Sequence, residues 1–199
     1  LYQEAVKYDE GFVNAYISLY AHAIQSSDQE NFTKYINLAL KYINRLSEED
    51  RFLVRMDATL LDEENSQKRK KDILIMWAEL YPDSIRPKRV LASMAQMEGN
   101  YEEAVSHMKE VLKIAPGRHE FYLTLGNLYK MQGDYDTALS YYKQYVDLNP
   151  KNPEGYKTIA DQYLSQLDYQ NAQEYLLKAQ MMGATGPKFG ITLTNVNYK

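Results

Sequence analysis

Histidine and cysteine, the residues that most often bind metal ions, are sparse in this chain. Cysteine is absent, and the three histidines, His22, His107 and His119, are scattered and belong to no cluster with metal-ligand spacing. Without cysteine, disulfides, thiolate metal sites and cysteine nucleophiles are excluded. The histidines are therefore interpreted as ordinary helix residues, and neither a metal nor another cofactor is predicted.

Neighbouring carboxylates, which could act as general acids or bases, stand where helices are expected to begin. Glu102 and Glu103, like Glu48, Glu49 and Asp50, occupy the end of a helix at which its dipole favours negative charge. The chain has neither a glycine-rich phosphate loop nor a setting that would activate a serine nucleophile. We therefore expect that the chain is not an enzyme.

Positive charge is too dispersed to predict nucleic acid or a membrane as a partner. The formal net charge is −4, and the basic run QKRKKD at 67–72 is interpreted as a solvated helix edge rather than an anion site. Arg55, Arg86 and Arg89 would form an anion-binding patch only if the fold brought them together. No apolar run approaches the roughly 18 residues of a membrane helix, so membrane insertion is not expected.

The elements that must position these side chains follow from a repeat of 34 residues. Prolines, alanines and other small residues recur at this spacing, and so do tyrosines that follow a helix-capping residue. The four columns are Pro82, Pro116 and Pro150; Ala104, Ala138 and Ala172; Ala92, Gly126 and Ala160; and Tyr101, Tyr135 and Tyr169. Four columns in one register indicate stacked copies of one structural unit.

Residues 119–152 illustrate how one such unit is expected to fold. Tyr122 and Leu125 lie about one helical turn apart on an apolar face. Gly133 can adopt the left-handed conformation that ends a helix, and Asp134 can cap the helix that follows. The unit is therefore predicted to be an antiparallel pair of helices.

These units resemble tetratricopeptide repeats. Residues 119–152 match the aromatic, Leu-Gly, tyrosine, alanine, aromatic and proline positions of the family pattern at Tyr122, Leu125, Gly126, Tyr129, Ala138, Tyr142 and Pro150. They depart from it at Tyr145, where the family prefers alanine. The resemblance implies an all-α fold, a right-handed superhelical solenoid of about five antiparallel helix pairs, in which stacking buries a continuous apolar core.

We expect one repeat domain over residues 1–182. Clear repeats cover 85–118, 119–152 and 153–182, degenerate repeats cover 12–46 and 47–84, and residues 1–8 would end a preceding helix. Met181 and Met182 are expected to close the last apolar face. Residues 183–199 are rich in turn residues and then alternate apolar with polar ones, so they are predicted to be a short non-helical tail or the start of another segment.

In this family the first helices of the pairs line a groove, so the resemblance implies that their exposed side chains bind a peptide. Carried over by register, the binding positions are Arg55, Arg86, Arg89, Ser93, Gln96, Leu123, Asn127, Lys130, Lys157 and Asp161, joined in the degenerate repeat by Phe52 and Thr59. Asn127 is favoured most, because a side-chain amide can both donate to and accept from a peptide backbone. The carboxylate clamp of chaperone-binding members is not expected, since Glu154 reverses the charge of one of its lysines.

We therefore predict a scaffold that binds a protein or peptide, of a sequence still to be identified, in this groove. Two alternatives stay open. One is a regulatory or sensor module of a larger multidomain protein, suggested by the abrupt start and unlike tail of the chain. The other is a unit that self-associates through the exposed ends of the repeat stack. The compartment is undetermined, because cysteine-free chains occur in reducing and oxidising compartments alike; we favour the cytoplasm and leave the periplasm open.

Overall fold

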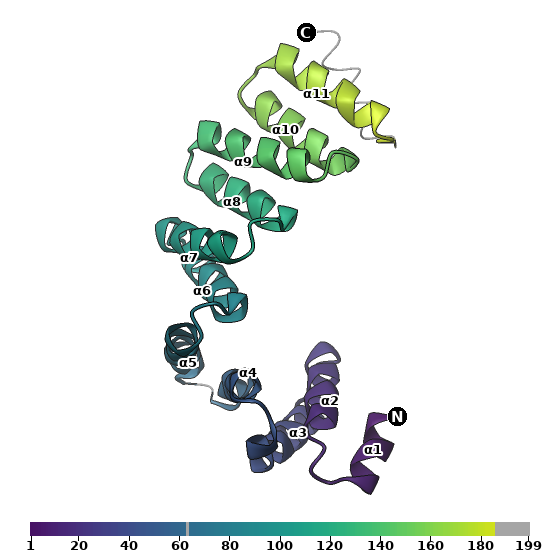
Figure 1. Cartoon of the computed structure of the whole chain (residues 1–199), viewed down its shortest axis with the longest axis vertical. Helices are drawn as coiled ribbons and strands as arrows, with labels where there is room; N and C mark the ends of the chain where they lie inside the picture. The colour runs from purple at the N-terminus through teal and green to yellow at the C-terminus, as the bar shows by residue number, and fades with distance from the viewer. Residues whose placement is uncertain (63, 186–199) are drawn as a thin grey trace. The chain divides into compact units, whose positions relative to one another are not determined.

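All the regular secondary structure in the residues that the structure describes is helical. A computed structural model describes residues 1–62 and 64–185, and these form eleven α-helices and two short 3-10 turns, with no strand among them (Figure 1). The all-α class predicted from the repeat is confirmed. Most of the predicted tail, residues 186–199, lies outside the described residues. The chain divides into two compact units, Leu1–Pro87 and Lys88–Lys199, and each is described by itself.

The first unit contains the helices that precede the clear repeats. They are α1 (Tyr2–Tyr8), α2 (Val13–Gln25), α3 (Gln29–Lys41), α4 (Glu48–Ala58) and α5 (Ser66–Leu80), with 3-10 turns η1 (Ile43–Arg45) and η2 (Thr59–Leu61). The pair α2 and α3 packs around a buried cluster that includes Tyr20, Phe32 and Ile36. In the next pair, Trp77 of α5 is buried and stacks on Phe52 of α4 with ring centroids 5.8 Å apart.

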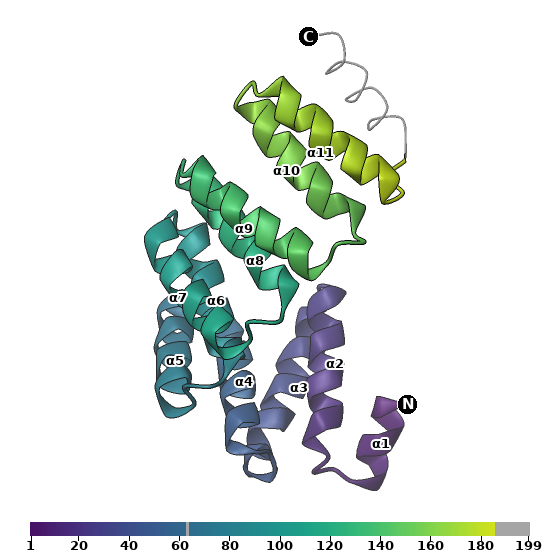
Figure 2. The same ribbon diagram turned by 45° about the horizontal axis from the view of Figure 1, so that its top comes forward.

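The second unit is built from helix pairs in the 34-residue register. Helix α6 (Ile85–Met97) crosses the division after Pro87 and is followed by α7 (Tyr101–Ile114), α8 (His119–Met131), α9 (Tyr135–Leu148), α10 (Pro153–Ser165) and α11 (Tyr169–Met181). Helices α8 and α9 lie side by side, as do α10 and α11, and α10 also packs against α9 (Figure 2). The first helix of each pair is thus α6, α8 or α10, and the second is α7, α9 or α11.

The turn inside each of these pairs follows the same register. Gly99, Gly133 and Leu167 are spaced 34 residues apart and have φ values of +77°, +82° and +62°. The next residue caps the second helix by accepting a hydrogen bond from the backbone N–H three positions later, and it is Asn100, Asp134 or Asp168. The turn is therefore kept where leucine replaces glycine, although a side chain makes the left-handed conformation more costly.

Two glycines allow neighbouring helices to approach closely. A Cβ atom on Gly126 of α8 would lie 2.4 Å from the ring carbon Cε1 of Tyr142 in α9. A Cβ atom on Gly155 of α10 would lie 2.8 Å from Cγ2 of Val146 and 2.9 Å from a ring carbon of Tyr145. Gly155 thus leaves room for the ring of Tyr145, which is the tyrosine that departs from the family pattern.

A lysine–tyrosine motif that repeats with the helix pairs accounts for part of the high tyrosine content. The ammonium group of Lys109 on α7 lies 5.4 Å from the ring centre of Tyr129 on α8, and that ring stacks at 5.4 Å on Tyr141 of α9. The same contacts recur one repeat later, at 6.0 and 5.7 Å, between Lys143, Tyr163 and Tyr175. Cation–π and ring contacts therefore link α8 and α10 to the second helices on both sides of each of them.

Candidate functional site

Three of the predicted groove residues line one hollow of about 290 Å³ in the second unit. Arg89, Ser93 and Gln96 lie on α6 at spacings of four and three residues, which place them on one face of the helix. Ala92 of α6 also lines the hollow, and side chains of α7 and α8 form the rest of the lining: Met108, Glu120, Phe121, Thr124 and Leu128. Because Met108, Phe121 and Leu128 are buried, the hollow combines an apolar floor with a polar rim.

Arg89 is positioned by an aromatic ring rather than by a carboxylate. Its guanidinium lies 5.6 Å from the centre of the Phe121 ring, which is almost fully buried. Arg118 approaches the same ring at 5.3 Å, but it also donates a 2.6 Å hydrogen bond to Glu120. A hydrogen bond from its own backbone N–H, together with the contact to Arg118, lowers the pKa of Glu120. Within the described part of the chain Arg89 has no such carboxylate partner, so its charge is available to a ligand.

The other polar side chains of the rim are only partly used by the protein. The Nε2 atom of Gln96 lies 3.5 Å from the thioether sulfur of Met131, which is a weak acceptor. The hydroxyl of Thr124 donates to the backbone carbonyl of Glu120 at 3.0 Å. Ser93 is exposed at the rim. The rim therefore offers amide and hydroxyl groups beside the cation.

Three further predicted residues form a charged cluster on α8 and α10. Partial burial raises the pKa of Asp161, and the positive charges of Lys130 and Lys157 act in the opposite direction. Lys157 also donates to both carboxylate oxygens of Glu154, at 3.0 and 3.1 Å. Two cations and two carboxylates therefore nearly balance one another here, in contrast to the unpaired charge of Arg89.

Asn127 is exposed on α8, but its amide is partly engaged within its own repeat. Its Oδ1 atom accepts a 2.8 Å hydrogen bond from the hydroxyl of Tyr142 on α9. The Nδ2 donors have no hydrogen-bond acceptor in residues 1–62 and 64–185. Donation to a peptide backbone is thus open to this amide, and its predicted role in peptide binding stays a prediction.

The remaining predicted positions are Leu123 in the second unit and Arg55 and Arg86 in the first. Leu123 is half-buried and packs against the apolar cluster that contains Tyr142. Arg55 and Arg86 are exposed in the first unit, where Nη1 of Arg86 lies 3.8 Å from a carboxylate oxygen of Asp50. The anion-binding patch of three arginines therefore stays a prediction, since Arg89 belongs to the other unit.

Phe52 and Thr59 were expected to face the groove, but both are buried. Phe52 has 6% of its surface exposed and packs between Trp77 and Tyr81. Thr59 has 4% exposed, and its hydroxyl donates to the carbonyl of Met56 at 2.7 Å. At Thr59 the register fails because α4 ends at Ala58 and continues as a 3-10 turn, which no longer keeps the spacing of an α-helix. At Phe52 it fails because the ring stacks on Trp77 of α5.

The groove register did not single out Phe121 or Thr124. Phe121 belongs to the buried side of α8, and it becomes part of the site only because Arg89 of the preceding first helix lies over its ring. The sequence contains one weak signal for it, an aromatic residue in the first turn of a first helix. Pairing that residue with Arg89 required the spacing between α6 and α8.

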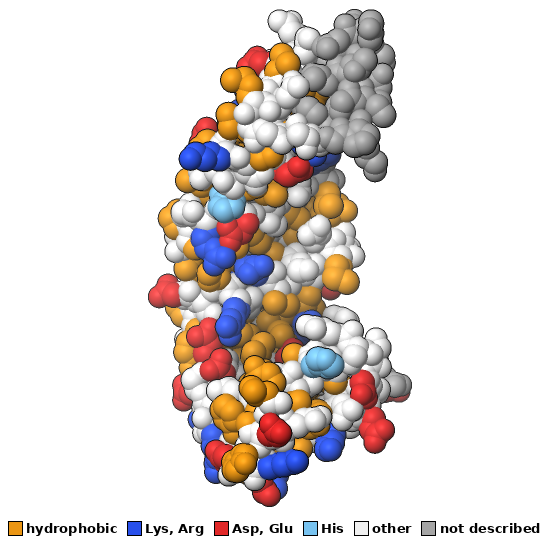
Figure 3. Space-filling view, turned by 90° about the vertical axis from the view of Figure 1, so that its right-hand side faces the viewer, with side chains coloured by type: hydrophobic (Ala, Val, Ile, Leu, Met, Phe, Trp, Pro, Cys, Tyr) orange, Lys and Arg blue, Asp and Glu red, His pale blue; other side chains and the backbone are white. Residues whose placement is uncertain are grey.

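The surface gives little indication of other kinds of chemistry. Among the described residues, no three His, Asp or Glu side chains are grouped so that they could hold a metal ion. None of the helices in that part of the chain is both long and apolar enough to cross a membrane. Figure 3 shows acidic, basic and apolar side chains interspersed on one face. A surface that mixes acidic, basic and apolar side chains is suited to a protein partner rather than to a partner with charge of a single sign.

Comparison with known proteins relates the helix pairs to a family. Residues 83–151 match the tetratricopeptide repeat family. Among solved structures, a crystal structure of MamA protein has a TM-score of 0.64 and 17% identity, covering 88% of this chain and 98% of that chain. MamA 41-end from Desulfovibrio magneticus RS-1 has a TM-score of 0.64 and 14% identity over 87% of this chain and 95% of that one.

A third structure of similar fold belongs to a larger protein. In the crystal structure of the APC/C hetero-tetramer Cut9-Hcn1, the TM-score is 0.65 and the identity 15%, and the match covers 98% of this chain but 38% of that chain. At these identities the three structures establish a shared fold. No curated protein sequence matches the chain.

Proposed function

We propose that this chain, whose residues 83–151 match the tetratricopeptide repeat family, is a scaffold that binds a peptide segment of another protein along the first helices α6, α8 and α10. The repeat fold supports a general protein-binding role. Cut9, which shares the fold, is found in a hetero-tetramer with Hcn1. The observation that carries the proposal is the hollow beside Arg89, where a cation without a carboxylate partner stands over the ring of Phe121.

The ligand that best suits this hollow is an extended peptide with an acidic residue. A guanidinium can hold a carboxylate through two parallel hydrogen bonds, and its contact with Phe121 restricts the freedom that Arg89 would otherwise lose on binding. The buried side chains of Met108 and Leu128 would receive a neighbouring apolar residue of the peptide. Gln96 at the rim would form a hydrogen bond with the backbone of the peptide.

The peptide would continue from this hollow along α8 and α10. Asn127 keeps its Nδ2 donors for a backbone carbonyl, and the cluster around Asp161 presents both signs of charge. Because charges in that cluster nearly cancel, we assign most of the charge selectivity to Arg89. Groups farther along the groove would fix the register of the peptide.

Selection from a peptide library tests this proposal. Random peptides displayed on phage would be selected on the full chain, and the recovered peptides would be measured by fluorescence anisotropy. We expect an acidic residue to be enriched, and we expect Arg89→Glu to weaken binding by roughly tenfold or more, about 1.4 kcal/mol. The variant Gln96→Ala should produce a smaller loss.

Lys113→Glu provides the matched control. Lys113 is exposed on α7, a second helix, and contributes nothing to the lining of the hollow, so this variant makes the same change of side-chain charge elsewhere. Selected peptides that bind wild type, Arg89→Glu and Lys113→Glu equally well would overturn the proposal.

A further inference from the structure

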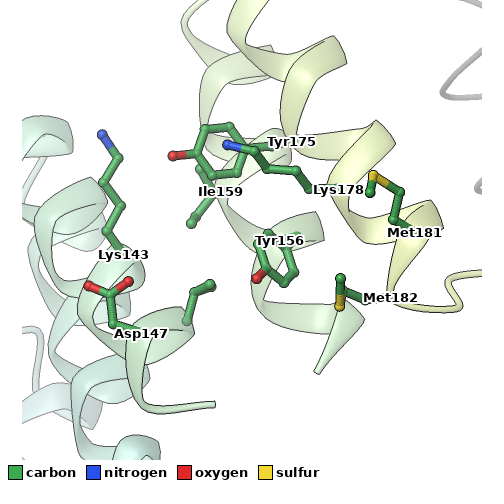
Figure 4. A pocket seen from close by; sticks show the side chains of 9 residues that line it. Lys143, Asp147, Tyr156, Ile159, Tyr175, Lys178, Met181 and Met182 are labelled. Atoms are coloured by element: carbon green, nitrogen blue, oxygen red, sulfur yellow. The ribbon is translucent and has the colours of Figure 1, made fainter. Parts of the chain in front are cut away.

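A second hollow lies among the side chains of α9, α10 and α11 and shares no residue with the first. Its volume of about 340 Å³ falls within the range of roughly 300–1,000 Å³ that is common for ligand pockets. Figure 4 shows Tyr156 and Ile159 of α10 between the side chains of α9 and those of α11. Ile159 is fully buried and Tyr156 is held by a hydrogen bond from its hydroxyl to the carbonyl of Pro150, so this central part of the lining is preformed.

The α11 side of the hollow ends in two exposed methionines. Met181 and Met182 have 78% and 38% of their surfaces exposed, although they were expected from the sequence to close the last apolar face. Both line the hollow together with the ring of Tyr175 (Figure 4). Thioethers and tyrosine rings make favourable contacts with aromatic side chains, and flexible methionines adapt to the shape of what they contact. This wall is therefore suited to an aromatic group.

Charges of both signs stand at the rim, and only some of them are paired. Lys178 on α11 is bound to Glu174 at 2.5 Å. Lys143 on α9 lies 6.0 Å from the ring centre of Tyr163 and has no carboxylate at ion-pair distance among the described residues. Asp147, one turn after Lys143 on the same helix, also lines the hollow. A ligand carboxylate is thus favoured beside Lys143 and disfavoured beside Asp147.

The positions one repeat earlier carry different side chains. The residues 34 positions before Met181 and Met182 are Asp147 and Leu148, and the residue 34 positions before Asp147 is Lys113. Lys143, in contrast, has a counterpart one repeat earlier, because Lys109 lies 34 positions before it. The two thioethers and the Lys143–Asp147 polarity therefore belong to this place in the chain and not to the repeat pattern as a whole.

We propose that this hollow is a second docking site, for a partner segment that inserts an aromatic side chain between α9 and α11 and places a neighbouring carboxylate beside Lys143. The aromatic ring would rest on Tyr156 and Ile159 and be covered by the methionines. The partner would contact the second helices α9 and α11, together with Tyr156 and Ile159 of the first helix α10, and it would use none of the predicted groove positions. One chain could then bind two segments at once.

Synthetic peptides can test the aromatic and the acidic requirement separately. The probe is a fluorescein-labelled 12-residue peptide of glycine and serine with one tryptophan and one glutamate two positions before it. Anisotropy would be measured with the full chain. We expect replacement of the tryptophan by alanine, or of the glutamate by lysine, to weaken binding by at least tenfold. Met181→Asp, which installs the residue found one repeat earlier, should weaken it similarly.

A charge exchange makes the site assignment specific. Lys143→Glu should lose the glutamate peptide and gain the lysine peptide, whereas Lys109→Glu, the matched variant one repeat earlier, should change neither. Because the groove is also expected to prefer an acidic peptide, these variants are compared in the Arg89→Glu background, which removes that preference and separates this site from the groove. Equal effects of Lys143→Glu and Lys109→Glu, or no discrimination among the peptides, would overturn the proposal. So would binding that appears only after removal of residues 186–199, because the hollow would then serve that segment.

Discussion

The hydroxyl of Tyr142 donates a 2.8 Å hydrogen bond to Oδ1 of Asn127, and the ring of the same tyrosine lies against Gly126. Tyr142 is almost completely buried, and burial raises its pKa to about 12, so the hydroxyl remains a donor at neutral pH. One core side chain therefore sets the spacing of α8 and α9 and also orients an amide of the candidate groove. Packing and the site are coupled at this point.

The two partners of this hydrogen bond should respond unequally to substitution. Asn127→Ala removes the acceptor of a buried hydroxyl, which costs about 1–3 kcal/mol, whereas Tyr142→Phe leaves an exposed amide that water can satisfy and costs about 0.5–1.5 kcal/mol. The double variant should be about as stable as Tyr142→Phe alone. Urea unfolding of all three variants measures the coupling. Simple additivity of the two losses would show that the bond does not couple the helices.

Gly126→Ala should destabilise the chain although alanine favours helices. The new Cβ atom would lie 2.4 Å from the ring of Tyr142, which cannot move freely because it is buried. Overpacking costs of about 1–3 kcal/mol should exceed the gain in helix propensity of at most about 1 kcal/mol. Gly117→Ala is the control, because its Cβ atom would meet nothing within 4 Å. Equal unfolding midpoints for the two variants would contradict this packing explanation.

Leu167→Gly should stabilise the chain. Leu167 has φ +62° and is 69% exposed, so glycine would relieve the left-handed conformation and remove little buried surface. The relief of about 1–2 kcal/mol is partly offset by the greater entropy of glycine in the unfolded chain, which leaves a gain of about 0.5–1 kcal/mol. Gly133→Leu, at the matched turn one repeat earlier, should lose stability. In thermal unfolding, we expect the midpoint to rise for Leu167→Gly and to fall for Gly133→Leu.

Asp57 should make the stability of the first unit depend on pH. It accepts a 2.9 Å hydrogen bond from the hydroxyl of Tyr20, and burial raises its pKa above 3.8, against the effects of that bond and of Lys70. Because the folded state holds the proton more tightly, the contribution of Asp57 is fully present below pH 3.8 and is lost as the pH rises through the folded pKa. Asp57→Asn, which keeps an acceptor for Tyr20, should flatten this dependence in urea unfolding measured between pH 3 and 7.

The pH dependence of stability that we expect from Asp28 has the opposite sign. Its side chain caps α3, and hydrogen bonds from the side chain and the backbone of Asn31 lower its pKa. Its contribution is therefore present above pH 3.8 and is lost as the pH falls through the lower folded value. Asp28→Asn should reduce the loss of stability that occurs as the pH falls. Asp57→Asn should leave that loss unchanged. The same pH profile for both variants would contradict these assignments.

Local features of the helix pairs were predictable because each depends on residues close in sequence. The turn at Leu167 follows the 34-residue register although no glycine marks it, and Asp168, the residue before Tyr169, caps the next helix. The room for Tyr145 was not predictable. The space for the Tyr145 ring depends on Gly155 in the following helix pair. The sequence pattern of one repeat does not predict which residue of the next repeat will contact that ring.

In the candidate sites, too, contacts within one helix were predictable and contacts between helices were not. The register identified Arg89, Ser93 and Gln96 as neighbours on one face, because helical spacing alone puts them there. It did not identify the ring beneath Arg89, since Phe121 is on another helix. It also placed Phe52 toward the groove, where stacking on Trp77 buries it instead.

By itself the sequence determined that this chain forms helix pairs in a 34-residue register, because caps, turns and apolar spacing act over a few neighbouring residues. Only the tertiary structure decided which charges are left without partners and which apolar side chains remain exposed. The roles proposed for Arg89, Lys143 and Met181 depend on helices that lie beside these residues in space. Those contacts depend on the distances between helices, which the identities of single residues do not encode.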